Sequence, residues 1–201
     1  MKKLLLTVAL MAITGTAVAG PEWTYADIGW VIVDSGESNP LMTGGGDEDD
    51  VNGFSVGGSI AFGGNWHANL EYQDIDESGS GGIEFDGYRA AIGLHPALTA
   101  DTDLVMEVGY FDVDLDGPAG LDNEADGFDV SFGVRSMITD KLELRAIIST
   151  SMGEWDDMGG EEDFTDSGLT VGGQWNWNDN ASTSVDLTED EVVKVAYRWN
   201  F

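Results

Sequence analysis

The chain lacks cysteine, has little positive charge and has no long apolar run beyond its first segment. Without cysteine it can form no disulfide framework, no thiolate metal site and no acylated lipoprotein anchor. Acidic residues outnumber basic ones 38 to 8, for a net charge of −30. This balance disfavours nucleic-acid binding, which needs a basic face. After residue 19 the longest apolar run is Trp30–Val33, far short of the about 20 residues of a transmembrane helix.

Residues 1–19 have the features of a secretory signal peptide. Lys2 and Lys3 supply a positive end, residues 4–13 form an apolar core, and Ala17–Ala19 is a small-residue cleavage site before Gly20. The alternative is an uncleaved anchor helix, for which the apolar core is too short. The sequence therefore predicts a mature chain of residues 20–201. It forms one domain, because no linker interrupts it.

Apolar and polar residues alternate with a period of two along the mature chain, between clusters of Gly, Asp, Asn and Ser. This pattern predicts an all-β protein, and the 7 Trp, 8 Phe and 5 Tyr argue against disorder. The expected strands cover residues 24–33, 51–62, 66–74, 83–94, 103–113, 126–136, 142–153, 167–177, 181–187 and 192–201. Short connections at 63–65, 95–102, 137–141 and 178–180 alternate with longer acidic ones at 34–50, 75–82, 114–125 and 154–166; the last, 188–191, is short.

Each expected strand has an uncharged apolar face and a polar face that carries glycines and charges of both signs. The charges on the polar faces are nearly balanced: Asp27, Glu71, Glu107, Asp129 and Glu143 stand against Arg89, Arg135, Arg145, Lys194 and Arg198. Buried charges are tolerated only when they are paired. If the polar faces are enclosed, we therefore predict that these ten residues form an ion-pair network. In it Arg135 and Arg145 are held by acids such as Glu107, Asp129 and Glu143.

Alternation alone fits both a soluble sandwich or barrel, which hides its apolar face, and a membrane barrel, which turns that face to lipid. The positions of the aromatic residues favour the membrane barrel, because they form two bands like interfacial girdles. One band holds Tyr72, Tyr88, Tyr110 and Phe128, and the other holds Phe62, Trp66, Trp175, Trp177, Trp199 and Phe201. We predict a closed antiparallel up-and-down transmembrane β-barrel of ten strands. Eight strands is the alternative, because residues 181–187 are fewer than the about 9–11 of a crossing strand.

The chain stops within an alternating aromatic strand whose last same-face residues include Tyr197, Trp199 and Phe201. This ending resembles the C-terminal assembly signal of Gram-negative outer-membrane barrels. The mature chain is similar to the broad class that includes OmpX/Ail-like and OmpW-like proteins. The resemblance implies an outer-membrane location, contact with lipid and lipopolysaccharide, and the barrel assembly machinery as a partner during biogenesis. We expect a monomer.

In such barrels the short turns face the periplasm and the long loops face outward. In this orientation we expect 28 of the 38 acids at the outer ends of the strands, without Lys or Arg among them. Asp112, Asp114 and Asp116 copy the start of an EF-hand loop, but the twelfth position is Asn123 instead of glutamate. Three interpretations stay open: a Ca²⁺ site at these aspartates, diffuse Mg²⁺ or Ca²⁺ binding shared with lipopolysaccharide phosphates, and a solvated acidic surface. No other cofactor is predicted.

The sequence offers little support for an enzyme. Its two histidines, His67 and His95, lie near short turns on the expected periplasmic side, and no nucleophile-elbow motif is present. We expect His67 to face the lumen in a structural role and His95, before Pro96, to be in solvent. The favoured function is a structural or surface-interaction barrel with an acidic outer crown. A narrow cation-favouring pore is the alternative, and an outer-membrane enzyme is the least favoured.

Overall fold

The computed structural model describes residues 21–33, 51–77, 84–117, 121–157, 160–189 and 192–201. The predicted signal peptide and the acids of the connection at 34–50 lie outside these residues. The described part of the chain holds no helix long and apolar enough to cross a membrane. The strands are β1 (Tyr25–Val33), β2 (Val51–Phe62), β3 (Trp66–Glu77), β4 (Glu84–Leu94), β5 (Thr102–Gly117), β6 (Leu121–Met137), β7 (Leu142–Asp157), β8 (Gly160–Asn178), β9 (Ala181–Thr188) and β10 (Val192–Asn200).

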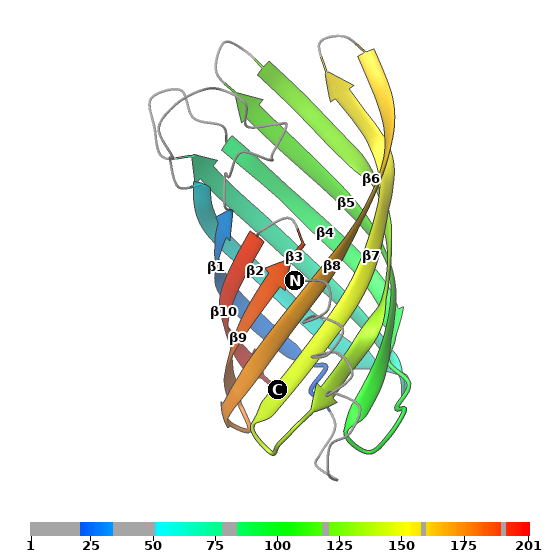
Figure 1. Cartoon of the computed structure of the whole chain (residues 1–201), viewed down its shortest axis with the longest axis vertical. Coiled ribbons are helices and arrows are strands. Elements are labelled where there is room, and N and C mark those ends of the chain that lie inside the picture. Colours follow the sequence, from blue (N-terminus) through cyan, green and yellow to red (C-terminus); the bar gives the residue numbers. More distant parts are fainter. Residues whose placement is uncertain (1–20, 34–50, 78–83, 118–120, 158–159, 190–191) are drawn as a thin grey trace.

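The ten strands form one closed antiparallel barrel in which each strand pairs with its sequence neighbour and β1 pairs with β10 (Figure 1). Closure pairs every strand on both sides and removes the open edge that a sheet would otherwise present. The prediction of ten strands is confirmed and the alternative of eight is wrong. Although β9 has only eight residues, it pairs with both β8 and β10.

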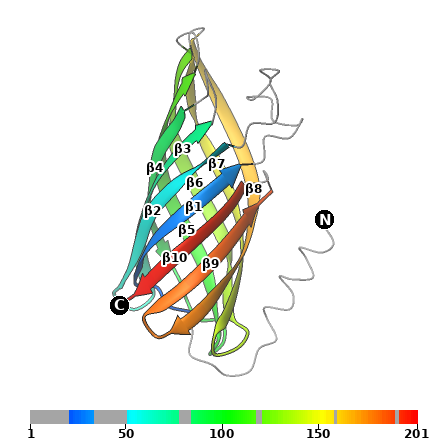
Figure 2. The same cartoon turned by 90° about the vertical axis from the view of Figure 1, so that its left-hand side faces the viewer.

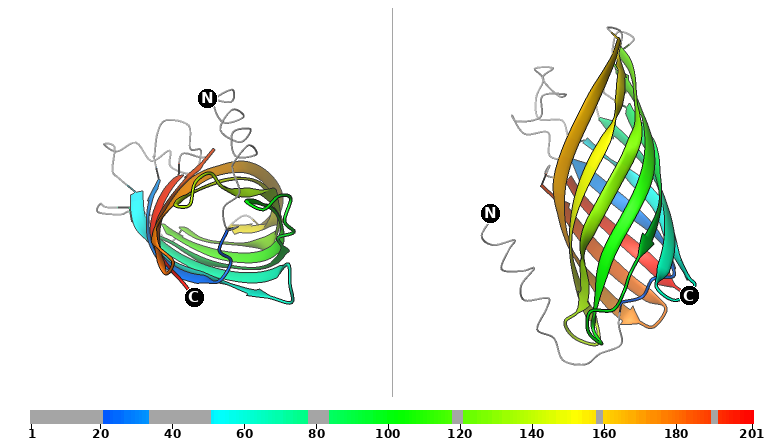
Figure 3. Two further views of the ribbon diagram at one scale, coloured as in Figure 1. Left: turned by 90° about the horizontal axis from the view of Figure 1, so that it is seen from below. Right: turned by 90° about the vertical axis from the view of Figure 1, so that its right-hand side faces the viewer.

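The start of β1 and the end of β10 lie at one end of the barrel, which we call the proximal end; the other is the distal end (Figure 2). Short connections join the strands at the proximal end. In the turn between β2 and β3, Gly63 and Gly64 have φ angles of 56° and 88°, which glycine adopts without steric cost. The left view of Figure 3 shows the barrel from below, with the strands closed into a ring. We call the space inside this ring the lumen.

Several strands are longer than the sequence predicts, β3 by three residues and β5 to β8 by at least four each, and two expected loops are largely strand. Residues 114–117 and 121–125 extend β5 and β6, and residues 154–157 and 160–166 extend β7 and β8. The prediction of loops at 114–125 and 154–166 is therefore wrong. Clusters of Asp, Glu and Gly indicate loops when they are read alone, but here the acids lie on paired strands, and those at 112–116 and 122–126 occupy alternate positions.

The barrel wall has uneven height around its circumference. Strands β5 to β8 are 16 to 19 residues long, whereas β9, β10 and β1 have eight or nine. Because these two groups are each contiguous in the ring, one side of the barrel is tall and another is low (Figures 1 and 2).

The apolar face of the strands points outward. Large apolar side chains are exposed all around the barrel, among them Trp30 at 52%, Val108 at 54% and Phe132 at 56%. They lie between the two aromatic bands, and we call this zone the membrane band. The inward positions of the same zone hold most of the buried polar and charged residues. The barrel therefore has the outward surface of a lipid-spanning protein.

Candidate functional site

Paired charges fill the lumen within the membrane band. Arg89 donates to both oxygens of Asp129, at 2.8 and 2.6 Å, and to Glu107 at 3.1 Å. On its other oxygen, Glu107 is 2.8 Å from Nε2 of His67, which is fully buried. His67 thus faces the lumen, as the sequence predicts. The pair between Arg89 and Asp129 lies directly against Gly109, where an added Cβ would collide with Asp129.

Three further ion pairs link strands on the inner side of the wall. Arg135 donates twice to Glu143, at 2.8 and 3.0 Å, and the two residues are only 4% and 1% exposed. The others are Arg198 with Asp27 at 3.1 Å and Lys194 with Glu71 at 2.7 Å. The structure therefore brings nine of the ten predicted network residues into ion pairs with one another.

The tenth network residue, Arg145, pairs with Asp186, an acid that is not among the ten residues of the predicted network. Arg145 Nε donates to Asp186 Oδ1 at 2.6 Å. Asp186 points inward because it occupies the β9 position opposite both Gly172 and Lys194. The sequence analysis named acids such as Glu107, Asp129 and Glu143 for both arginines; Glu143 holds Arg135, whereas Arg145 pairs with an acid that was not named.

A tryptophan that the sequence analysis did not single out closes the proximal end of the lumen. Trp23 is 7% exposed, and its indole donates to Asp103 at 2.7 Å. Its ring lies 4.4 Å from those of both His67 and His95, and the Arg135 guanidinium sits 4.3 Å above it. No periodic signal could have shown this contact, because Trp23 precedes β1.

The sequence analysis expects His95, before Pro96, to be in solvent, and this prediction is wrong. Its ring stacks on Trp23 with an interplanar angle of 17°, and its side chain is 10% exposed. The reason is the inward course of residues 21–24, which brings the indole over the ring. The two histidines therefore belong to the closure of the proximal end.

Beyond the distal aromatic band, the polarity of the two faces is inverted. In β5 the sequence Phe111–Asp116 places Phe111, Val113 and Leu115 inward and the three aspartates outward. We call these outer parts of β3 to β8 the distal extension. Its inward positions also hold Ile75, Phe85, Ala125, Trp155 and Phe164. The sequence analysis missed this apolar interior, although the same alternation, followed past the tyrosines, would have shown it.

The outward face of the distal extension carries directly opposed carboxylates on neighbouring strands, which we call the carboxylate rows. One row runs Asp112, Asp126, Glu154 and Asp163; the next runs Asp74, Asp86, Asp114, Glu124 and Asp156; a third runs Asp76, Glu84 and Asp116. Like charges directly opposite each other across strands are destabilising. The first row starts at the interfacial band, because it continues from Tyr72 and Tyr88.

The predicted calcium ligands Asp112, Asp114 and Asp116 do not converge on one point. They are alternate residues of an extended strand, so adjacent ones are about 7 Å apart along it. Among the described residues, no group of three or more His, Cys, Asp or Glu is arranged to hold a metal ion. The nearest carboxylates to each aspartate are instead across the strand pairs.

The carboxyl group of Asp86 shows the repulsion within the rows. It lies beyond Tyr88, outside the membrane band, and is opposed by Asp74 and Asp114. Desolvation, followed by the charges of Asp114, Asp74 and Asp112, raises the pKa of Asp86 above its usual value. The folded barrel therefore holds a proton at this site more tightly than the unfolded chain.

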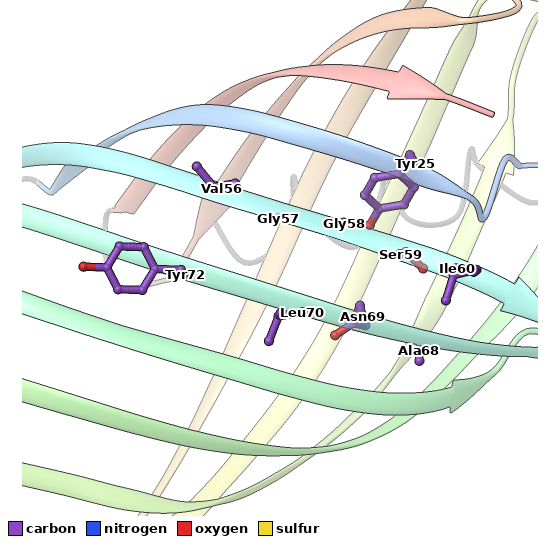
Figure 4. A pocket seen from close by; sticks show the side chains of 10 residues that line it. All are labelled: Tyr25, Val56, Gly57, Gly58, Ser59, Ile60, Ala68, Asn69, Leu70 and Tyr72. Atoms are coloured by element: carbon purple, nitrogen blue, oxygen red, sulfur yellow. The ribbon is translucent and has the colours of Figure 1, made fainter.

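A recess of about 550 Å³ lies at β1, β2 and β3 and includes the lipid-facing side of the wall. Gly58 and Ala68 provide little bulk there, and Val56, Leu70 and Tyr72 border the recess (Figure 4). The recess has apolar walls on the surface that faces lipid, so acyl chains can fill it.

In sequence, the chain matches no protein-family model and no curated protein. In structure it is similar to an outer membrane channel from Pseudomonas putida F1, with a TM-score of 0.52 and 9% identity over 94% of this chain and 99% of that one. KdgM porin (TM-score 0.47, 8% identity, 88% and 99% covered) and OprG from Pseudomonas aeruginosa (0.45, 11%, 91% and 98%) are also similar. At these identities the likeness establishes the fold alone, that of outer-membrane β-barrels. It supports neither the OmpX/Ail-like nor the OmpW-like class in particular.

Proposed function

We propose that this protein is an outer-membrane barrel with a structural, surface-interaction role. Divalent cations bridge opposed carboxylates within its rows and join them to the phosphates of lipopolysaccharide. The observation that carries the proposal is the set of three rows of opposed carboxylates on the outward face. They face no Lys or Arg, because the described bases point into the lumen or, in Lys141, lie at a proximal turn.

The spacing of the rows suits a bridging cation. Directly opposite Cβ atoms in an antiparallel pair are about 4.5–5.5 Å apart, and Ca²⁺ binds carboxylate oxygens at about 2.3–2.6 Å in flexible arrangements. One ion between Asp86 and Asp114 would therefore contact both carboxylates and relieve their repulsion. Its remaining coordination positions can take water or phosphate oxygens.

The level of the rows suits a lipopolysaccharide partner. Tyrosines mark the depth of lipid headgroups, and Tyr88 and Tyr110 each place a hydroxyl about 3.3 Å from Asp112. The first carboxylates thus stand where the headgroup phosphates of the outer leaflet begin. This role needs no catalysis, and His67 and His95 lie at the opposite end of the barrel.

The packing of the lumen favours a barrel that does not conduct ions. The alternative is a narrow cation pore. Trp23 and Arg135 pack together inside the proximal end, and the ion pairs of Arg89, Arg145 and Arg198 occupy part of the space inside the wall. We expect no cation-selective steps from the refolded protein in planar bilayers. Regular steps would favour the pore.

The test compares thermal unfolding of the refolded barrel in lipopolysaccharide vesicles with Mg²⁺ and with Na⁺ at equal ionic strength. We expect Mg²⁺ to raise the midpoint more than Na⁺ does. The double variant Asp86→Asn/Asp114→Asn should lose part of that gain, and EDTA should remove it.

The matched control is Glu189→Gln. It removes an exposed distal carboxylate that lies outside the rows, so it should keep the full response to Mg²⁺. An equal response to Na⁺, or an equal loss in the control and the double variant, would overturn the bridging role.

A further inference from the structure

We infer that the distal lumen is a binding site for a small organic cation with an aromatic or short aliphatic body. A cavity of about 250 Å³ opens there, lined by Phe85, Phe111 and Val113 together with Glu71, Gln73 and Arg89. Apolar walls with a few polar groups are typical of small-molecule sites. Its size suits a single ring with a short substituent.

The walls of this cavity are held by packing from behind. Phe85 packs against a buried cluster of Val31, Val51 and Ile75, which are 1%, 4% and 6% exposed. The Phe111 ring lies 6.2 Å from that of Phe164. The cavity is therefore a formed feature of the distal interior.

The polar side of the cavity favours a cation. The guanidinium of Arg89 is engaged by Asp129, Glu107 and Asn69. Both hydrogen bonds described for Glu71 end on Oε1, from Lys194 at 2.7 Å and Gln73 at 2.6 Å, and its side chain is 33% exposed. Glu71 can thus offer its second oxygen to a positively charged group.

The surroundings of the cavity add to this preference. The carboxylate rows give the distal end a negative potential that concentrates cations at the mouth. The faces of Phe85 and Phe111 attract a cation further through their ring quadrupoles. A neutral molecule gains neither effect, and an anion is repelled at the mouth.

The experiment uses the full barrel in nanodiscs of zwitterionic lipid, with Mg²⁺ present to saturate the rows. Benzylammonium, benzyl alcohol and benzoate are the probes, since they share one ring and differ in charge. We expect benzylammonium to bind about tenfold more tightly than benzyl alcohol and benzoate to bind least, as measured by calorimetry and saturation-transfer NMR.

Three variants locate the binding. Val113→Phe fills the cavity and should abolish binding, whereas Ile148→Phe adds bulk to the lipid face, where Ile148 is 60% exposed, and should not alter it. Phe111→Leu should weaken benzylammonium about threefold or more relative to benzyl alcohol. It provides the test if Val113→Phe does not fold.

Equal affinity for the three probes would overturn the inference, as would full binding by Val113→Phe or an unchanged preference in Phe111→Leu. The Asp86→Asn/Asp114→Asn variant should bind benzylammonium in Mg²⁺ as the native protein does. Failure of cation bridging at the rows is thus distinguishable from failure of the lumenal site.

Discussion

The membrane band and the distal extension are built from the same strands, yet they have opposite surfaces. On β5, Val108 of the band and Asp114 of the extension both point outward, while Glu107 and Val113 both point inward. The alternation keeps its period across the tyrosines, and only the identity of the apolar face changes. The surrounding medium decides which face is apolar, because lipid cannot solvate a charge and water does not favour apolar surface.

The two zones also keep their interiors together by different means. In the band, charges that water cannot fully reach are paired within the lumen, as in Arg135 with Glu143. In the extension, apolar side chains such as Val51 and Ile75 pack inside a wall whose outer face is acidic. Removing one partner of an ion pair in the band should therefore lower the stability of the barrel most. Changing an outward charge in the extension should affect its stability least.

The largest effect is expected from Arg135→Leu, which leaves Glu143 without its partner at 1% exposure. An uncompensated buried charge costs about 3–5 kcal/mol, to be measured as the free energy of unfolding in detergent. The double variant Arg135→Leu/Glu143→Leu should recover most of the loss. A double variant as unstable as the single one would show that the pairing is not the cause.

Introducing arginine at two outward positions of one strand tests the inversion directly. Val108→Arg should cost about 2–4 kcal/mol if Val108 lies near the bilayer midplane. Asp114→Arg should instead stabilise the barrel by about 0.2–1 kcal/mol, because it places a base opposite Asp86 and Glu124. Urea unfolding in vesicles measures both. Equal costs would mean that both positions meet the same medium.

Gly109→Ala should have a smaller effect on the membrane band. Its new Cβ would meet the Asp129 carboxylate that Arg89 holds, and such overpacking costs about 1–3 kcal/mol. The control is Gly173→Ala, whose Cβ would find Leu144 at 3.5 Å, an ordinary contact. If both variants unfold at the same denaturant concentration, Gly109 is not needed to admit the pair.

The smallest effect is expected from Asp86→Asn in the extension. The pKa of Asp86 is raised, so the folded state loses stability relative to the unfolded state as the pH rises from 3.8, its usual value, through the folded pKa. The variant should therefore be more stable than the native chain at neutral pH, by about 0.2–1 kcal/mol. The gain should vanish below pH 3.8. A gain that is independent of pH would contradict the repulsion.

Much of the barrel follows from the sequence because a period of two is a direct record of strand geometry. The number of strands and the inward position of residues such as Arg89 and Glu107 could be predicted in this way. The partner of Arg145 could not, because it depends on how far β9 is staggered against β7 across the closed sheet. The length of β6 was also missed, since its acids resemble those of a loop until their pairing with β5 is known.

The difference in length between β8 and β9 makes two sides of the barrel unlike each other. The carboxylate rows occupy β3 to β8, while β9, β10 and β1 end low. In the part of the chain that the structure describes, molecules in the same leaflet therefore meet rows of carboxylates on one side of the barrel and the short strands on the other. We therefore expect contacts with other membrane components to depend on the direction from which they approach in the plane of the membrane.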